Sequence, residues 1–321
     1  MTELTHNTEN SAALTVAAML ERGEQLFEAE QLYFGHGTTN AWDEAVYLLS
    51  SVLNLPPDAD RSLLTQPLTP QQQSDVQALY QRRVTERIPA PYLTGIAWFC
   101  DLPFVVDERV IIPRSPVAEL IFSGFRPWCE YEPSHVLDLC TGSGCIGIAC
   151  TYAFEQAQVV LSDISGEALA IANMNIAKHE VADRVRALES DLFDSLGGQR
   201  FDLIVSNPPY VDANDLAEMP SEYQHEPELA LASGKDGLDF TRRLLREAAD
   251  YLTESGVLVV EVGNSSVALE AAFLNVPFIW LEFSEGDAGV FVLTRNELLE
   301  HQESFPDLRI ITIIQNGYRR A

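Results

Sequence analysis

The sequence predicts an α/β protein in which a parallel sheet, covered by helices, follows a small helical domain. Short apolar runs typical of buried strands alternate with helical stretches from residue 135 onward. The first 90 residues instead place apolar side chains at helical spacing. With 321 residues, the chain is long enough for a full α/β domain and a smaller second one.

The helical domain is expected to span residues 1–91. Prolines and a glycine mark the helix ends, because proline removes a backbone donor and glycine favours the left-handed conformation in which many helices terminate. The expected helices are residues 12–34, stopped by Gly35, residues 41–54, ended by Pro56-Pro57, and a third that opens at Thr69-Pro70 and continues until Pro89 and Pro91 break the chain. This part of the sequence holds no catalytic constellation, and we favour recognition of a partner over plain scaffolding.

A linker over residues 92–113 joins the two domains. Aromatic and apolar residues on either side of Asp101-Leu102-Pro103 predict a β-hairpin there. The α/β domain covers residues 114–321 and opens with a helix that starts at Pro113-Arg114-Ser115-Pro116 and continues to about Phe125.

The first strand of the α/β domain leads into a glycine turn. Residues 135–139 (His-Val-Leu-Asp-Leu) predict a strand, and residues 145–153 are typical of a helix. Glycines at a strand-to-helix turn let a ligand approach the backbone closely, and the helix N-terminus adds N–H donors. The residues of this motif that we expect at a cofactor are Asp138, Thr141, Gly142, Ser143 and Gly144.

Two acidic residues follow the next two strands. The strand over 158–162 ends in Asp163, whose carboxylate can accept from both hydroxyls of a ribose. The strand over 185–189 leads to Asp191-Leu192, and this second carboxylate can accept from an adenine amino group. A lone glycine turn is a weak signal, but three consecutive units with polar residues at one sheet edge are far more specific.

A fourth strand, over 201–205, stops at Ser206-Asn207-Pro208-Pro209-Tyr210. Proline cannot donate to a ladder, so the Asn207 side chain and the Pro208 carbonyl are expected at the edge of the sheet where α/β proteins bind ligands. Two neighbouring acceptors suit a planar NH2 group, which offers two donors. The alternative is a plain strand end with a rigid turn, and the upstream motifs favour the functional interpretation.

Two other classes of α/β protein fit less well. A dinucleotide-dependent oxidoreductase shares the glycine turn and the ribose carboxylate, but it does not need Asn-Pro-Pro-Tyr after the fourth strand. The sequence also lacks the phosphate loop G-x-x-x-x-G-K-[ST] of many ATP-binding proteins.

The rest of the chain is expected to complete the sheet. Residues 211–237 predict a long acidic loop that serves as a lid or substrate loop, in which His225 is taken as a structural hydrogen bonder rather than a catalytic base. The later elements are expected as a helix over 238–252, a strand over 257–262, an antiparallel hairpin of strands over 278–283 and 289–294, and a β-rich run over 308–314 without an assigned role.

Composition limits the partners. Twenty basic and 48 acidic residues give a net charge of −28, which disfavours naked nucleic acid and favours basic partners, with adaptation to a salty environment as the alternative. The sequence shows neither a membrane-spanning run nor a signal peptide, so we expect a soluble, cytoplasmic protein. The cysteines lack metal-site or disulfide spacing, and we expect no metal site. Three of the five, Cys140, Cys145 and Cys150, fall on a strand end and the following helix and are taken as packing residues, whereas Cys100 and Cys129 are given no role.

These motifs together resemble the class I S-adenosylmethionine-dependent methyltransferases, and most closely the HemK-like protein-glutamine N5-methyltransferases. The likeness covers nearly the whole chain, including Ile112-Pro113-Arg114 and the stretch from Glu226 to Leu231. It implies a seven-stranded Rossmann-like sheet with its last strand antiparallel. It also implies S-adenosylmethionine as cofactor and methyl transfer to a glutamine side-chain amide.

Within this family, the release-factor enzymes usually have glycine where this sequence has Cys140. That departure, together with Ala97-Trp98-Phe99-Cys100, Asp107-Glu108-Arg109-Val110 and Pro113-Arg114-Ser115-Pro116, resembles the PrmB-type branch. Its members methylate a glutamine of large-subunit ribosomal protein L-three, so the implied partner is a basic ribosomal protein, free or in an assembly intermediate. The alternatives are a release factor as substrate, adenine-N6 methylation of DNA, which needs a basic track, and a non-catalytic assembly factor.

The family also implies roles for individual residues. Gly142 and Gly144 are placed at the methionine end of the cofactor, Asp163 at the ribose and Asp191-Leu192 at the adenine. The residues implied to hold the substrate amide are Asn207, Pro208, Pro209 and Tyr210, of which Asn207, Pro208 and Tyr210 are expected to be catalytic and Asn207 also to border the cofactor. An amide nitrogen is a poor nucleophile, so orientation and two acceptors are expected to activate it without a side-chain base.

Overall fold

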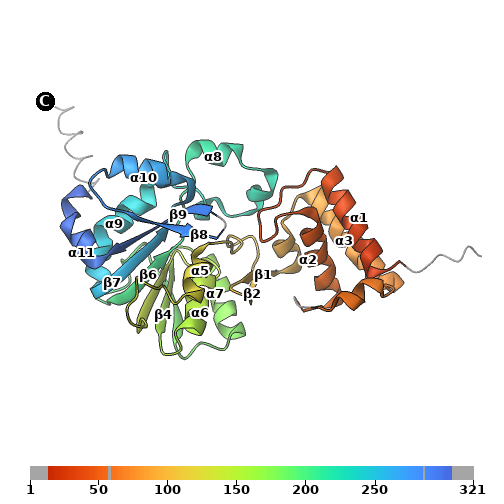
Figure 1. Cartoon of the computed structure of the whole chain (residues 1–321), viewed down its shortest axis with the longest axis horizontal. Helices are drawn as coiled ribbons and strands as arrows, with labels where there is room; N and C mark the ends of the chain where they lie inside the picture. The colour runs from red at the N-terminus through yellow and green to blue at the C-terminus, as the bar shows by residue number, and fades with distance from the viewer. Residues whose placement is uncertain (1–13, 57–58, 285, 306–321) are drawn as a thin grey trace, which may run out of the picture. The chain divides into compact units, whose positions relative to one another are not determined.

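The computed structural model describes residues 14–56, 59–284 and 286–305 (Figure 1). The expected β-rich run over 308–314 lies outside the described residues. By its internal contacts the chain divides into two compact units, the first ending at Thr94 and the second beginning at Gly95. The hairpin therefore lies within the second unit.

The first unit is helical and is built around one apolar core. Its elements are α1 (Val16–Ala29), α2 (Ala41–Leu53), a short 3-10 helix (Arg61–Thr65), α3 (Pro70–Glu86) and α4 (Ala90–Thr94). The second and third expected helices are confirmed, and Asn54 ends α2 in the left-handed conformation with φ 52°.

Two expectations for this unit are wrong. The first helix ends at Ala29, well before Gly35, and the chain turns at Gln31 with φ 50°. Pro91 does not break the chain but lies in the first turn of α4. Proline is tolerated there because the N–H groups of a first helical turn have no partner within the helix.

The second unit contains a seven-stranded sheet with the order β5-β4-β3-β6-β7-β9-β8. Every neighbouring pair is parallel except the two pairs made by β9, which is antiparallel to both β7 and β8. This arrangement confirms the class I S-adenosylmethionine-dependent methyltransferase fold. The strands are β3 (His135–Leu139), β4 (Gln158–Asp163), β5 (Val185–Glu189), β6 (Phe201–Ser206), β7 (Leu252–Glu261), β8 (Ile279–Phe283) and β9 (Gly286–Thr294).

The first four strands match the expected ranges almost residue for residue, and the hairpin of the last two is confirmed. Two strands begin earlier than expected, at Leu252 for β7 and at Gly286 for β9. The separate two-stranded hairpin, β1 (Ile96–Phe99) with β2 (Leu102–Val105), is also confirmed. The turn residues Cys100 and Asp101 both have positive φ there.

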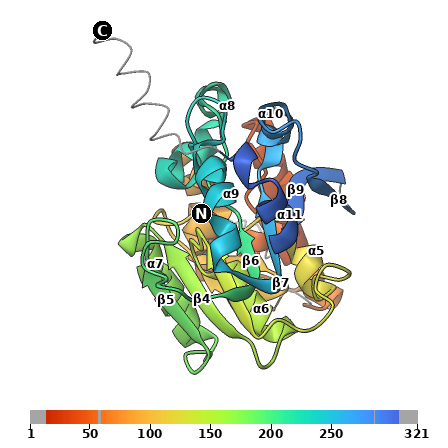
Figure 2. The same ribbon diagram turned by 90° about the vertical axis from the view of Figure 1, so that its left-hand side faces the viewer.

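Helices cover both faces of the seven-stranded sheet (Figure 2). One apolar core joins the sheet to α5 (Val117–Phe122), α6 (Cys145–Ala153), α7 (Gly166–Lys178) and the hairpin. A second core joins the opposite face to α9 (Asp239–Tyr251), α10 (Ser266–Ala272) and α11 (Arg295–Glu300). The helix expected up to Phe125 is thus shorter, because α5 ends at Phe122. None of the described helices is long and apolar enough to cross a membrane.

The segment between Tyr210 and Gly237 is not an open loop. It contains α8 (Ala213–Glu218) and two 3-10 helices, Ser221–His225 and Glu228–Ala230. Asp212 caps α8 by accepting from the backbone N–H groups of Asn214 and Asp215. Backbone hydrogen bonds join Val211 to residues 231–233 at the base of the segment. The segment is therefore a folded insertion after β6, and we call residues 211–237 the excursion.

Candidate active site

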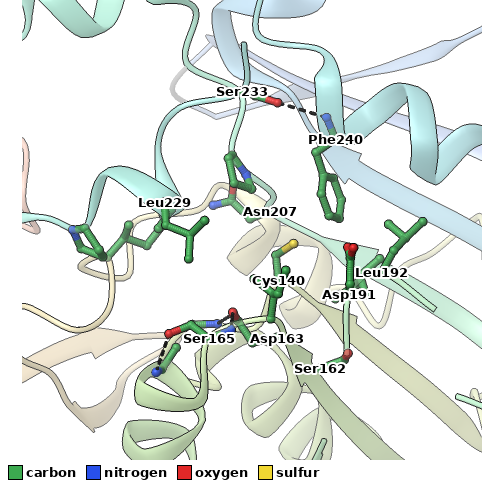
Figure 3. A pocket seen from close by; sticks show the side chains of 18 of the residues that line it. Cys140, Ser162, Asp163, Ser165, Asp191, Leu192, Asn207, Leu229, Ser233 and Phe240 are labelled. Carbon is green, nitrogen blue, oxygen red and sulfur yellow. Dashed lines mark hydrogen bonds between the residues drawn. The ribbon is translucent and has the colours of Figure 1, made fainter. Parts of the chain in front are cut away.

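A cavity of about 310 Å³ lies at the carboxyl ends of the parallel strands (Figure 3). Figure 3 shows Asn207 and Cys140 reaching into it from the ends of β6 and β3, and Phe240 reaching in from α9. Of the sequence-predicted site residues, those that line the cavity are Gly142, Asp163, Asp191, Leu192, Asn207 and Pro209. Those that do not are Asp138, Thr141, Ser143, Gly144, Pro208 and Tyr210.

The turn after β3 has the left-handed backbone that its glycines allow. Gly142 has φ 54°, and a Cβ on it would meet no protein atom within 4 Å. This open space beside the cavity is where a ligand can approach the backbone. Gly144 has φ 83° and begins α6, and a Cβ there would lie 3.0 Å from the Leu161 side chain.

Asp138 supports this turn from beneath rather than facing the cavity. Its Oδ2 accepts from the Thr141 hydroxyl at 2.6 Å and from the Gly147 backbone N–H at 2.8 Å. Asp138 is 1% exposed, and this burial raises the pKa of its carboxyl to about 6. Asp138 and Thr141 therefore shape the turn from inside the protein.

Asn175 of α7, which the sequence analysis did not single out, ties the turn to the hairpin. Its Nδ2 donates to the carbonyl oxygens of Val105 at 3.0 Å and Ser143 at 2.8 Å. Its Oδ1 accepts from the Val105 N–H at 2.7 Å. The side chain is fully buried, and these three bonds satisfy its donors and its acceptor.

Asp163 lies at the end of β4, where the sequence predicts a ribose-binding carboxylate. Its Oδ2 accepts from the Gly142 N–H at 3.0 Å, and its Oδ1 accepts from the Ser165 N–H at 2.9 Å. These bonds hold the carboxylate at the cavity and leave further lone pairs for a ligand. Burial raises the pKa of Asp163, against the lowering by the backbone N–H groups of Ser165, Gly142 and Ile164.

The far end of the cavity contains an ion pair that the sequence analysis missed. Arg243 of α9 lies 2.9 Å from Asp191 Oδ1, and both residues line the cavity. Ser162 lies nearby on β4 (Figure 3) and also lines the cavity. Its buried hydroxyl has no hydrogen-bond partner among the described residues. Such a hydroxyl is costly to leave unpaired, so it suits a polar atom of a bound ligand.

Asn207 is held at the cavity by its neighbours. The Ser206 hydroxyl donates to the Leu139 carbonyl at 2.6 Å and fixes the end of β6 against β3. Pro208 is buried, whereas Asn207 is half-buried and lines the cavity. Within the described part of the chain, the Asn207 side-chain amide makes no hydrogen bond. Its carbonyl oxygen is therefore available to a substrate.

Tyr210 is braced from several sides. Its hydroxyl donates to Glu261 Oε1 at 2.9 Å, and the Ser265 hydroxyl donates to its backbone carbonyl at 2.7 Å. Burial and the neighbouring Glu261 raise the pKa of Tyr210 well above its ordinary value. A Cβ on Gly263 would lie 2.6 Å from the Tyr210 ring, so a glycine is needed there.

Arg114 and Ser115 come from the motif that the sequence analysis quoted only for its resemblance. The Arg114 guanidinium donates to both oxygens of Glu226, at 2.6 and 2.8 Å. The Ser115 hydroxyl donates to Glu261 Oε2 at 2.6 Å. The adjacent residues Arg114 and Ser115 thus bind two different carboxylates: Arg114 binds Glu226, and Ser115 binds Glu261, which also accepts from Tyr210.

The cysteines divide into two groups. Cys145 and Cys150 are buried in an apolar core, which confirms packing for them, and Cys129 is buried in the same core. For Cys140 that expectation is wrong: it is half-buried and lines the cavity beside Asn207. Its φ of 61° turns the backbone at the end of β3. Burial raises the pKa of the Cys140 thiol well above its ordinary value, so it is not a reactive thiolate.

Comparison with known proteins agrees with this geometry. Residues 126–221 match the family model Methyltransferase small domain. The chain is 52% identical over 280 residues to the ribosomal protein uL3 glutamine methyltransferase of Francisella tularensis, covering 86% of this chain and 89% of that protein. It is 48% identical over 287 residues to the protein of the same name from Neisseria gonorrhoeae, covering 89% and 96%.

A solved structure, ribosomal protein L11 methylase from Lactobacillus delbrueckii, is 20% identical to this chain. It has a TM-score of 0.39 and covers 57% of this chain and 78% of that one. A similarity this low carries no information about function.

Proposed function

The chain belongs to the family of ribosomal protein uL3 glutamine methyltransferases, and we propose that it methylates a glutamine of uL3, the large-subunit protein L-three. The methyl group comes from S-adenosylmethionine and is transferred to the side-chain amide nitrogen. The observation that carries the proposal is the free amide of Asn207 at the cavity, beside the glycine turn and Asp163.

The cavity fits S-adenosylmethionine at three points. The open space beside Gly142 admits a ligand to the backbone, and Asp163 has lone pairs left for ribose hydroxyls. The unpaired Ser162 hydroxyl and the Asp191-Leu192 turn suit the adenine end. When bound, this cofactor supplies an electrophilic methyl group on a positively charged sulfur.

The residues of the chain then act on the substrate amide. A glutamine nitrogen is a weak nucleophile because its lone pair is delocalised into the carbonyl. The Asn207 carbonyl oxygen, at the cavity, accepts one N–H, and the backbone carbonyl of Pro208 is assigned as the second acceptor although Pro208 itself does not line the cavity. Both bonds increase electron density on the nitrogen as positive charge develops. The same two bonds aim the lone pair, and orientation of this kind contributes on the order of 7 kcal/mol at best.

Tyr210 is assigned to packing on the amide plane, because its hydroxyl is already occupied by Glu261. The surplus proton of the methylated amide leaves to water after transfer, so the reaction needs no side-chain base. His225, which the sequence analysis took as a structural hydrogen bonder rather than a base, does not line the cavity.

The net charge of the chain also supports the assignment of the substrate. A net charge of −28 favours a basic ribosomal protein and disfavours DNA as substrate. We expect the free protein or an assembly intermediate, in which basic segments are accessible, rather than finished ribosomes. Ribosomal proteins are made and assembled in the cytoplasm, so we expect the reaction to take place there. The helical unit is assigned to recognition of this partner.

A methyl-transfer assay with labelled S-adenosylmethionine tests the proposal. Purified uL3, a class-one release factor and double-stranded DNA are compared as substrates, each at low and moderate salt. Label on uL3 alone is the expected result, with the modified glutamine identified by mass spectrometry. Label on the release factor alone or on DNA alone would reject the substrate assignment. Failure to bind S-adenosylmethionine would reject the enzyme assignment itself.

A further inference from the structure

A second hollow, of about 440 Å³, lies on the folded excursion between Tyr210 and Gly237. We call it the α8 groove, because α8 and the two 3-10 helices that follow it form its walls. Its lining is about half apolar and half polar, and its members are Ala213, Leu216, Ala217, Met219, Tyr223, Gln224, Glu226, Glu228 and Leu231.

The α8 groove and the active-site cavity share one wall. Along residues 226–231, Pro227, Leu229 and Ala230 line the cavity. Their neighbours Glu226, Glu228 and Leu231 line the groove. Leu229 is 60% exposed, so this strip forms the rim between the two hollows. A polypeptide that inserts one side chain into the cavity across Leu229 brings its adjacent residues to the groove.

Hydrogen bonds and an ion pair fix the floor of the α8 groove. The side chain of Glu226 is fully buried. Both of its oxygens accept hydrogen bonds from the Arg114 guanidinium, and it also accepts from the Ile112 N–H at 2.9 Å. The Arg114 guanidinium lies 5.4 Å from the centre of the Tyr223 ring, another groove residue. The charge at the floor is therefore neutralised, and the floor is set before any partner arrives.

The rim of the groove is acidic. Asp215, Glu218 and Glu228 are exposed on it or beside it, and residues 211–234 contain neither lysine nor arginine. The apolar part of the groove, formed by Leu216, Met219 and Leu231, together with a negatively charged rim, is complementary to an apolar side chain flanked by lysine or arginine. It repels nucleic acid, so the fitting partner is a basic polypeptide.

From these observations we propose that the α8 groove binds the substrate residues next to the target glutamine. The occupant is a basic segment of the ribosomal protein with one apolar side chain seated among Leu216, Met219 and Leu231. This inference rests on the proposed function, which supplies the basic protein partner, and it assigns the recognition of sequence context to this surface.

The first test removes rim charge without touching the cavity. In the double variant Asp215→Asn/Glu218→Gln, the KM for uL3 is expected to rise roughly fivefold at low salt, because two rim charges that attract the segment are lost. The KM for S-adenosylmethionine and the kcat at saturating uL3 are measured alongside. The matched control is Glu130→Gln/Glu132→Gln, which removes two exposed acids just before the amino end of β3, whereas the cavity lies at the carboxyl ends of the parallel strands.

An equal rise in KM in the control would show a general charge effect and overturn the proposal. So would an unchanged KM in the double variant while the wild-type enzyme methylates uL3. If the wild-type enzyme does not methylate uL3 at all, the proposed function fails instead, and the two failures are thereby distinguished.

The second test locates the bound segment. A photoreactive benzoylphenylalanine replaces Ala217, which is exposed at the groove, and in a control it replaces Glu130. Irradiation with uL3 is expected to join Ala217's position to residues within a few positions of the methylated glutamine. Cross-links only to distant parts of uL3, or equal yield from position 130, would overturn the assignment.

Discussion

Arg114 and Glu226 are 112 residues apart in the sequence and form a bidentate ion pair, with N–O distances of 2.6 and 2.8 Å. The pair ties the start of the α/β domain to the excursion that carries both the cavity wall and the α8 groove. Burial by itself lowers the pKa of Arg114, but the charge and hydrogen bonds of Glu226 outweigh it and raise that pKa.

Breaking this pair on one side should destabilise the protein strongly. We expect Glu226→Gln to reduce the free energy of unfolding by about 3–5 kcal/mol, because it leaves the Arg114 charge without its partner in a buried site. Denaturant unfolding measures the change. Combining it with Arg114→Met should cost less than the sum of the two single changes, since no unpaired charge remains. Additive losses in the double variant would contradict a direct interaction.

Asn207→Ala should nearly abolish turnover while cofactor binding survives. The substitution removes one of the two acceptors that we propose for the substrate N–H groups. We expect kcat to fall by at least about 100-fold, as for loss of one preorganised group in other enzymes. Methyl transfer to uL3 and calorimetric titration with S-adenosylmethionine measure the two effects separately. Asn173→Ala, an exposed change on α7, serves as the control. Normal turnover in Asn207→Ala would refute the mechanism.

Tyr210→Phe should retain most activity but lower stability. The ring, which we assign to packing on the substrate amide, remains, whereas Glu261 loses one of its two hydroxyl donors in a site that is 5% exposed. We expect a loss of about 1–3 kcal/mol in the free energy of unfolding. Tyr210→Ala should in addition lower kcat. If Tyr210→Phe is inactive at a temperature where it is folded, the hydroxyl takes part in the chemistry.

Asp138 should make the protein less stable as pH rises from about 4 to 6. Burial raises its pKa in the folded protein to about 6, above the value of about 3.9 in an unfolded chain. Between these values the folded state holds a proton that the unfolded state has lost, so stability falls with increasing pH and then levels off. The full effect of such a shift is on the order of 3 kcal/mol.

The measurement for Asp138 is the free energy of unfolding against pH for the wild type and Asp138→Asn. Other carboxylates contribute to both curves, so the difference between them isolates this group. Between pH 4 and 6 the difference in the free energy of unfolding should change with pH by at most the slope expected for one bound proton. Above pH 6 the difference should be constant. Parallel curves throughout would contradict a raised pKa.

Much of the fold followed from local patterns. Strands β3 to β6 were predicted almost to the residue. For β3, β4 and β6 the reason is a mostly buried apolar run bounded by residues that cannot continue it, such as Pro208 or Gly142, whereas β5 is only partly buried. Residues 211–237 were predicted only as a long acidic lid or substrate loop. The short α8 and 3-10 helices within it were missed, because they depend on caps and tertiary contacts rather than on a long apolar period.

By itself, the sequence determined the order of strands and helices, the glycine turn, and the placement of Asp163 and Asn207 at one edge of a parallel sheet. These depend on backbone preferences and on apolar periodicity, which are local. Only the tertiary structure decided which polar groups face a ligand and which serve the scaffold. Asp138 and Thr141 turned inward and Cys140 turned to the cavity, although all three belong to one motif. Arg114 and Ser115 found acids far away in the chain, because a buried charge or hydroxyl must be satisfied by whatever group the fold brings within reach.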